Sequence, residues 1–377
     1  MAVIDIKNNQ SFCPAPWVSL YVDPGGKIDN CCVAKNNIGH VNTPVEQVLT
    51  GYKNITIQTD MLNNIEVPGC SWCKTGDNLQ QNFLKNYPDH ADPLYQSGQF
   101  QLKYLDARWS NTCNLACVYC TPVLSSLWAT ELNKFVKIEK ESKNNLLDYV
   151  VKNVESLTNV YLAGGEPLLM KENEILVEEL VNRNPNCQIL VNTNLLNVNT
   201  TLYHRLISLS NVQWLVSFED MGDRYEYIRY PGNWSQFETN LLELLKTVGP
   251  EKVSFNMVYM NLNYLTFWDA VDWAESRGFL KNKMTIALYN NGDIMEGPLD
   301  LRYLSYQSRE QAKQRILSKD YTTMHRYNTT LNYLQGDVKI NKDFVNYHTA
   351  MDKRRNLDSR SIFPGVYQSI ESTYESN

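Results

Sequence analysis

From about residue 101 onward, short apolar runs alternate along the chain with segments in which apolar residues recur at helical spacing. A run of four to eight apolar residues is typical of a buried strand, and an i, i+3, i+4 repeat is typical of one helix face. The predicted strands are 101–106, 159–163, 187–192, 212–218, 252–259 and 283–288, and the clearest helices between them are 146–154, 175–181, 237–245 and 265–274. Strands that alternate with helices predict a parallel sheet in an α/β fold.

The first 98 residues follow a different pattern. Residues 13–22 and 27–32 are predicted to form a hairpin, because Asp23-Pro24-Gly25-Gly26 between them is rich in turn residues. A helical stretch, 45–63, comes next, and two further helices, 307–318 and 342–355, are predicted beyond residue 290. We therefore expect three segments: 1–98, 99–290 and a helical extension over 291–377.

Composition narrows the class of protein. The chain has 377 residues, 43% of them hydrophobic and 20% charged, with a formal net charge of -6. That charge argues against bulk electrostatic binding of nucleic acid. The N-terminus lacks signal-peptide features, and no apolar run reaches the roughly 18 residues of a membrane span. We therefore expect a cytoplasmic protein that does not associate with membranes.

Three of the nine cysteines form a compact C-x3-C-x2-C array: Cys113, Cys117 and Cys120. Three thiolates on so short a loop can bind three irons of a 4Fe–4S cluster and leave the fourth iron open to a small molecule. Zinc is the alternative, but a structural zinc site closes with four ligands, and no fourth Cys or His follows at zinc-finger spacing.

Four more cysteines, Cys13, Cys31, Cys70 and Cys73, could close a second site in the first segment. An auxiliary 4Fe–4S cluster and zinc are both compatible with four cysteine ligands. Neighbouring residues of a strand point to opposite faces, so only one of Cys31 and Cys32 should reach the site.

The C-x3-C-x2-C array with Tyr119 before its last cysteine resembles the signature of the radical S-adenosylmethionine (radical SAM) superfamily. Gly164-Gly165-Glu166-Pro167, at the end of the second predicted strand, resembles the GGEP motif of that family. The resemblance implies a partial (β/α)6 barrel, reductive cleavage of S-adenosylmethionine, and a reductant such as flavodoxin or ferredoxin. Gly26 with Cys31 resembles the G-x4-C element of twitch and SPASM modules, which favours Cys31 over Cys32 and an auxiliary 4Fe–4S cluster, here placed before the barrel.

The same resemblance implies roles for individual residues. Cys113, Cys117 and Cys120 would hold the catalytic cluster, Gly164 and Gly165 would let backbone approach the bound S-adenosylmethionine, and Glu166 would fix its amino group. The other implied contacts to S-adenosylmethionine are Tyr119, Asn194, Ser217, Glu219 and Arg229. Core packing for Tyr119, helix caps for Asn194, Ser217 and Glu219, and a surface ion pair for Arg229 are the alternatives.

Two functions remain open at this point. The first is a radical SAM enzyme that abstracts hydrogen from a substrate C–H bond, with a small polar substrate slightly favoured over a ribosomal peptide. The second is a non-catalytic iron–sulfur sensor or scaffold. Elsewhere, Cys187 is expected to be a buried apolar residue. Lys353-Arg354-Arg355, with Arg360, is expected to be a solvated helix end, and a phosphate contact is the alternative.

Overall fold

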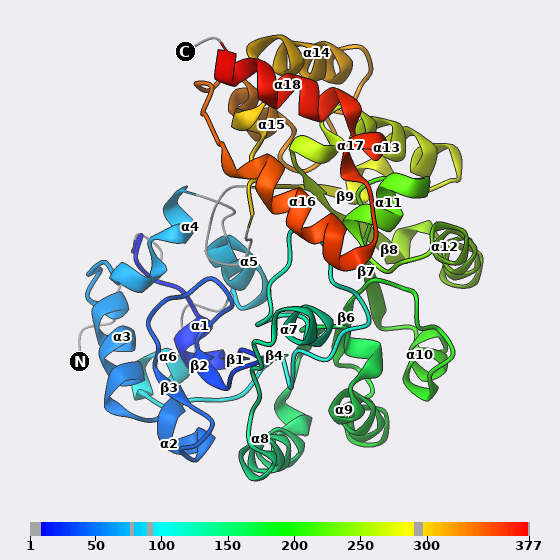
Figure 1. The fold of residues 1–377 in the computed structure, drawn as a ribbon. Coiled ribbons are helices and arrows are strands. Elements are labelled where there is room, and N and C mark those ends of the chain that lie inside the picture. Colours follow the sequence, from blue (N-terminus) through cyan, green and yellow to red (C-terminus); the bar gives the residue numbers. More distant parts are fainter. Residues whose placement is uncertain (1–8, 76–78, 89–92, 290–296, 376–377) are drawn as a thin grey trace. The chain divides into compact units, whose positions relative to one another are not determined.

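The computed structural model describes residues 9–75, 79–88, 93–289 and 297–375, and these residues form two compact units. The first unit comprises the described parts of Met1–Thr112, Phe135–Val191 and Leu209–Val212. The second comprises those of Cys113–Lys134, Asn192–Ser208 and Gln213–Asn377. Figure 1 labels most of the elements of both units. The fold is α/β, with nine strands in the described part of the chain.

In the first unit the strand order is β3-β2-β1-β4-β5-β6. β1 pairs in parallel with β4, and β4, β5 and β6 are parallel to one another, whereas β2 and β3 are antiparallel additions at the edge. The elements are α1 Ala15–Val18, β1 Ser19–Val22, β2 Lys27–Asp29, β3 Gly39–His40, α2 Val45–Leu49, α3 Tyr52–Leu62, α4 Trp72–Thr75, α5 Leu79–Asn86, α6 Pro93–Ser97, β4 Tyr104–Ala107, α8 Lys140–Lys152, β5 Asn159–Leu162, α9 Lys171–Arg183 and β6 Gln188–Thr193.

The second unit contains the parallel strands β7, β8 and β9 and all the described helices that follow β7 in the chain. Its core is aromatic: the ring of Phe218 lies 5.7 Å from that of Phe237 and 5.4 Å from that of Phe255. The elements are α7 Ser126–Leu132, α10 Thr201–Ile207, β7 Val212–Ser217, α11 Gly222–Ile228, α12 Trp234–Val248, β8 Val253–Tyr259, α13 Thr266–Ser276, β9 Met284–Leu288, α14 Tyr306–Leu317, α15 Tyr327–Leu334, α16 Asp343–Arg355, α17 Ser359–Ile362 and α18 Pro364–Glu375.

The six strands predicted beyond residue 101 are confirmed as β4 to β9, and the four helices as α8, α9, α12 and α13. The predicted hairpin is only partly right, because its first half begins with the helical turn α1. Pro14 and Pro16 explain the difference: proline has no N–H to donate and its fixed φ suits a first helical turn. The strand therefore begins at Ser19. The number of barrel strands and the division into 1–98, 99–290 and 291–377 stay predictions.

Thr50 and Gly51 divide the helix predicted over 45–63 into α2 and α3. Among the described residues, no helix is both long enough and apolar enough to cross a membrane.

Candidate functional site

The C-x3-C-x2-C array lies on the loop before α7, and two serines at the start of that helix fix the first half of the loop. Ser125 caps α7 by accepting a hydrogen bond from the backbone N–H of Trp128 at 3.1 Å. Its hydroxyl also donates to the carbonyl of Leu115 at 2.6 Å, and Ser126 Oγ accepts from the backbone N–H of Cys113 at 3.0 Å. Ser125, which caps the helix, and Ser126, its first residue, thus also hold the cysteine loop through hydrogen bonds.

The middle of the loop has its backbone hydrogen-bonded on both sides. The N–H groups of Ala116 and Val118 donate to carbonyls of the segment 228–230, at 2.6 and 2.8 Å. Between them, the carbonyl of Cys117 accepts from the indole N–H of Trp128 at 2.7 Å. Buried backbone groups are costly to leave without partners, so these bonds fix the direction of the Cys117 side chain.

A buried ion pair lies beside Cys117. The Nε of Arg229 donates to Oε2 of Glu219 at 2.6 Å, and its Nη2 donates to Oε1 at 2.5 Å. Nη2 also donates to the hydroxyl of Tyr119 at 2.6 Å, and that hydroxyl donates to Glu219 at 2.9 Å. The third nitrogen, Nη1, is 3.9 Å from Cys117 Sγ. A guanidinium therefore faces the sulfur of a predicted cluster ligand.

The electrostatics of this group follow from burial. The side chains of Arg229 and Glu219 are 4% and 1% exposed. Burial raises the pKa of the Cys117 thiol, and Arg229 partly offsets this effect. Burial alone would lower the pKa of Arg229, but the carboxylate of Glu219 raises that pKa well above its ordinary value. The guanidinium thus stays charged, and it is not a surface ion pair.

Asn194 and Ser217 lie at the C-terminal ends of β6 and β7. The side-chain amide of Asn194 donates to Oδ1 of Asn114 at 2.8 Å, and the hydroxyl of Ser217 donates to Oδ1 of Asn192 at 3.1 Å. Neither residue is a helix cap, because Thr200 caps α10 and α11 has no side-chain cap. The amide of Asn194 fastens the residue next to Cys113.

The glycine motif follows β5 in the first unit. A Cβ added to Gly165 would lie 2.2 Å from the carbonyl oxygen of Thr112, the residue before Cys113 in the sequence. The backbone N–H of Glu166 donates to the same oxygen at 2.7 Å, and Glu166 is buried. Gly164 has a φ of +132°, which L side chains rarely adopt. Gly165 is therefore needed for contact between two backbones of the protein itself.

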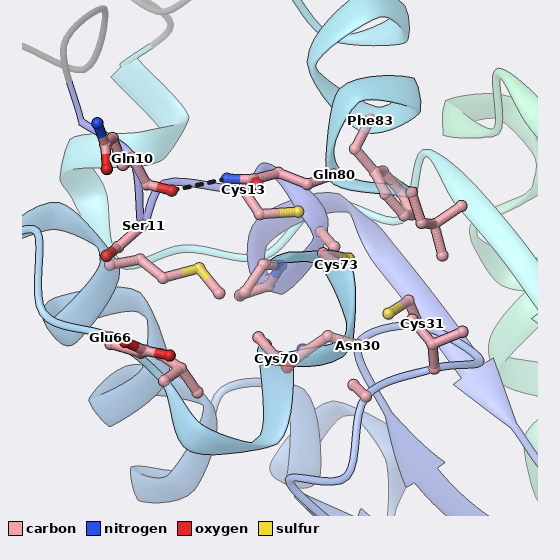
Figure 2. A pocket seen from close by; sticks show the side chains of 17 residues that line it. Gln10, Ser11, Cys13, Asn30, Cys31, Glu66, Cys70, Cys73, Gln80 and Phe83 are labelled. Carbon is pink, nitrogen blue, oxygen red and sulfur yellow. Dashed lines mark hydrogen bonds between the residues drawn. The ribbon is translucent and has the colours of Figure 1, made fainter. Parts of the chain in front are cut away.

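The second cysteine group is brought together in the first unit. Cys13, Cys31, Cys70 and Cys73 line one cavity, as Figure 2 shows. They come from the residues before α1, the turn after β2 and the segment at the start of α4. Cys32 is exposed and is not among the residues that line the cavity. Both cysteines follow the end of β2, so the alternation of strand faces does not govern the choice between them.

Burial and neighbouring thiols disfavour ionisation of Cys13, Cys31 and Cys70. Burial raises the pKa of Cys13 to about 12, and the neighbouring Cys70 and Cys73 add to the rise. Burial also raises the pKa of Cys31 and that of Cys70, where a hydrogen bond from the Asn36 amide, 3.5 Å from Sγ, partly offsets it. Thiolates here need a compensating positive charge, which bound iron provides. The donor set therefore fits an iron–sulfur cluster.

No three His, Cys, Asp or Glu side chains in the described part of the chain lie close enough to share a single metal ion. Four thiols suit zinc as well as a 4Fe–4S cluster.

Sequence reasoning missed several of these supporting residues. Ser125 carries a recognisable signal, since a serine before a helical repeat is typical of an N-cap. Asn36 and Trp128 carry none, because their contacts with Cys70 and Cys117 form only in the folded chain. Cys187 is 1% exposed, which confirms the prediction of a buried apolar residue.

The prediction of a solvated helix end over 353–355 is wrong for Arg355. Its side chain is 1% exposed, whereas that of the preceding Arg354 is 35% exposed. The charge run lies on a helix, so successive residues face different directions, and one of them points into the protein.

Comparisons with known proteins give one family match and a limited likeness to solved structures over part of the chain. No curated protein sequence matches. Among solved structures, SuiB from Streptococcus suis is 16% identical, with a TM-score of 0.42, over 75% of this chain and 61% of SuiB. The structure of native anSMEcpe with bound AdoMet is 18% identical, with a TM-score of 0.42, over 57% of this chain and 59% of that one. The chain thus spans about three fifths of each.

The family match covers the segment that carries the first cysteine array and the glycine motif. Residues 108–274 match the sequence model described as the Radical SAM superfamily. The segment begins at Arg108, just before the cysteine loop, and ends within α13. This match supports the assignment of residues 108–274 to the radical SAM superfamily.

Proposed function

We propose that this protein is a radical SAM enzyme that carries two 4Fe–4S clusters. Cys113, Cys117 and Cys120 would hold the cluster that binds S-adenosylmethionine. The observation that carries the proposal is the cysteine loop itself, whose backbone is hydrogen-bonded at residues 113–118 within a segment that matches the superfamily. When bound and given one electron by a reductant such as flavodoxin or ferredoxin, the cluster and S-adenosylmethionine would supply reductive cleavage of the sulfonium to methionine and a 5′-deoxyadenosyl radical.

The other residues that the resemblance implies have separate tasks in this proposal. Glu166 is buried, and its Oε1 accepts a hydrogen bond from the backbone N–H of Leu168 at 3.2 Å. Its carboxylate would receive the amino group of S-adenosylmethionine. Asn194 and Ser217, at strand ends, would hydrogen-bond the ribose and carboxylate. Gly164 would allow the ligand to approach the backbone.

Arg229, Glu219 and Tyr119 act as one group in this proposal. Arg229 places a lasting positive charge against Cys117, and Glu219 holds the guanidinium by two hydrogen bonds. Hydrogen bonds and charge near a ligand sulfur tune the potential of an iron–sulfur cluster. The role of Arg229 would therefore be to tune the cluster, in addition to the contact with S-adenosylmethionine that its sequence implies.

Cys13, Cys31, Cys70 and Cys73 would hold an auxiliary 4Fe–4S cluster of the twitch or SPASM type. This cluster would accept an electron during oxidation of the substrate or hold the substrate. We propose a small polar substrate in preference to a ribosomal peptide, a reductant such as flavodoxin or ferredoxin, and a cytoplasmic location. Hydrogen would be abstracted from a C–H bond of the substrate.

The test is anaerobic reconstitution of the full chain with iron and sulfide, followed by reduction in the presence of S-adenosylmethionine. We expect 5′-deoxyadenosine as a product, and a change in the electron paramagnetic resonance spectrum of the reduced cluster when S-adenosylmethionine is added. Tight binding of S-adenosylmethionine without 5′-deoxyadenosine would instead favour a non-catalytic sensor or scaffold.

Replacement of Asn36 should change the auxiliary cluster alone. Asn36→Leu removes the N–H that points to Cys70 Sγ, and a hydrogen bond to a ligand sulfur stabilises the more negative, reduced state. We expect the midpoint potential of the auxiliary cluster to fall by roughly 20–60 mV, the equivalent of one hydrogen bond. Redox titration followed by electron paramagnetic resonance measures it, and the other cluster serves as the internal control. An unchanged potential would show that the amide does not act on the sulfur.

A further inference from the structure

The helix α16 reaches the cysteine loop although it lies far along the chain, outside the segment that matches the family. Its last residue, Arg355, makes cation–π contacts with two aromatic rings. The guanidinium carbon lies 4.4 Å from the ring centroid of Trp128 and 4.8 Å from that of Tyr230. Nε donates to Glu131 at 3.0 Å. Cation–π contacts gain strength when both partners are removed from water.

The two rings belong to residues that bond the loop directly. Trp128 donates its indole N–H to the carbonyl of Cys117 at 2.7 Å, and the backbone carbonyl of Tyr230 accepts a hydrogen bond from the backbone N–H of Ala116 at 2.6 Å. Arg355 thus contacts both residues that hold Ala116 and Cys117, two successive positions of the loop.

A second residue of α16 contacts the loop itself. The hydroxyl of Tyr347 donates to the carbonyl of Val118 at 3.1 Å. Since Val118 also donates its N–H to the carbonyl of Ile228 at 2.8 Å, both backbone groups of the residue after Cys117 are satisfied. Tyr347 and Arg355 lie two turns apart on one helix, so a single rigid element acts on both sides of Cys117.

The helix is in turn fastened to the segment that accepts the loop. The hydroxyl of Tyr227 lies 3.0 Å from Oδ1 of Asp352 and 2.8 Å from Nδ1 of His348, both on α16. Oδ2 of Asp352 accepts hydrogen bonds from the N–H and hydroxyl of Ser359, at 2.9 and 2.6 Å. Tyr227 directly precedes Ile228. Hydrogen bonds therefore join the segment 227–230 both to the cysteine loop and to α16.

We propose that α16 is a support that keeps the loop 113–120 in the conformation that binds the cluster, with Arg355 as its main positioning residue. The loop has little regular structure of its own, and ligand groups bind best when they are held in place beforehand. The cluster at this loop belongs to the proposed function, but the support is a property of the folded chain and can be measured without it.

The test is hydrogen exchange of the full chain, cluster-free and under anaerobic conditions, read by mass spectrometry on peptides that contain the amides of Ala116 and Val118. In Arg355→Ala these amides should exchange about tenfold faster or more, because two cation–π contacts are lost. After reconstitution, the same variant should lose iron from this cluster to a chelator about tenfold faster than the parent.

Arg354→Ala is the matched control. Arg354 pairs with the same Glu131 at 2.6 Å, but its side chain is more exposed. The two cation–π contacts, at 4.4 and 4.8 Å, belong to Arg355. Exchange at Ala116 and Val118 should stay at the parental rate. Equal acceleration in both variants would overturn the proposal, because it would assign the effect to the charge on Glu131.

Tyr347→Phe keeps the proposal falsifiable if Arg355→Ala does not fold. Loss of this hydroxyl should speed exchange at Val118 more than at positions far from the loop, and parental rates there would overturn the proposal. The exchange experiment uses neither cluster nor S-adenosylmethionine. A parent that forms no 5′-deoxyadenosine would therefore count against the proposed function, whereas unchanged exchange in the variants would count against the support.

Discussion

Cys117→Ala should abolish formation of 5′-deoxyadenosine while it leaves the auxiliary cluster in place. Cys117 is the middle cysteine of the array, is 8% exposed, and has its carbonyl fixed by Trp128. Loss of one thiolate leaves two ligands on a loop that offers three, which is too few to hold a 4Fe–4S cluster. We expect iron to fall from about eight to about four ions per chain, since each cluster holds four. Iron analysis and product assay on reconstituted protein measure both effects.

The matched control removes the other cluster. In the double variant Cys70→Ala, Cys73→Ala, two of the four thiols that line the cavity are lost. Iron should again fall to about four per chain. S-adenosylmethionine should still be cleaved to 5′-deoxyadenosine without substrate, because the loop 113–120 is intact. A Cys117→Ala protein that still forms 5′-deoxyadenosine would exclude this array as the catalytic site.

The fold beyond residue 101 could be predicted because its signal is local. Each buried strand of a parallel sheet is a short apolar run, such as the one that became β8, and each covering helix buries one face, as α9 does with Leu176 and Leu180. The start of the hairpin could not be predicted by the same rule. Between Cys13 and Val18 the apolar run has a strand-like composition, but two prolines favour a helical turn there.

The cysteine groups were also readable from the sequence, because ligand type and spacing are local properties. The contacts that organise them were not. Arg229 and Glu219 were both expected to contact S-adenosylmethionine, yet each is the other's main partner. Arg355 belongs to a charge run that resembles a solvated helix end, and only the packing of Trp128 and Tyr230 gives it a place inside the protein. Such pairings join residues far apart in sequence.

Arg229→Met should strongly destabilise the protein, because it leaves the carboxylate of Glu219 buried without its cation. The two side chains are 4% and 1% exposed and share two short hydrogen bonds. Removal of one partner of a buried ion pair typically costs about 3–5 kcal/mol, since the remaining charge has lost both its water and its counter-ion. The free energy of unfolding from urea titration of the cluster-free protein measures the loss.

Two further variants separate this cause from a simple loss of contacts. Arg229→Met combined with Glu219→Gln removes both charges, so its free energy of unfolding should lie within about 2 kcal/mol of the parent, closer than that of the single variant. Arg360→Met breaks an ion pair of similar geometry with Glu371, but those side chains are 55% and 39% exposed, so the cost should be at most about 1 kcal/mol. If the double variant is as unstable as Arg229→Met alone, the packing of the arginine stem stabilises this region, and the buried charge of Glu219 does not explain the loss.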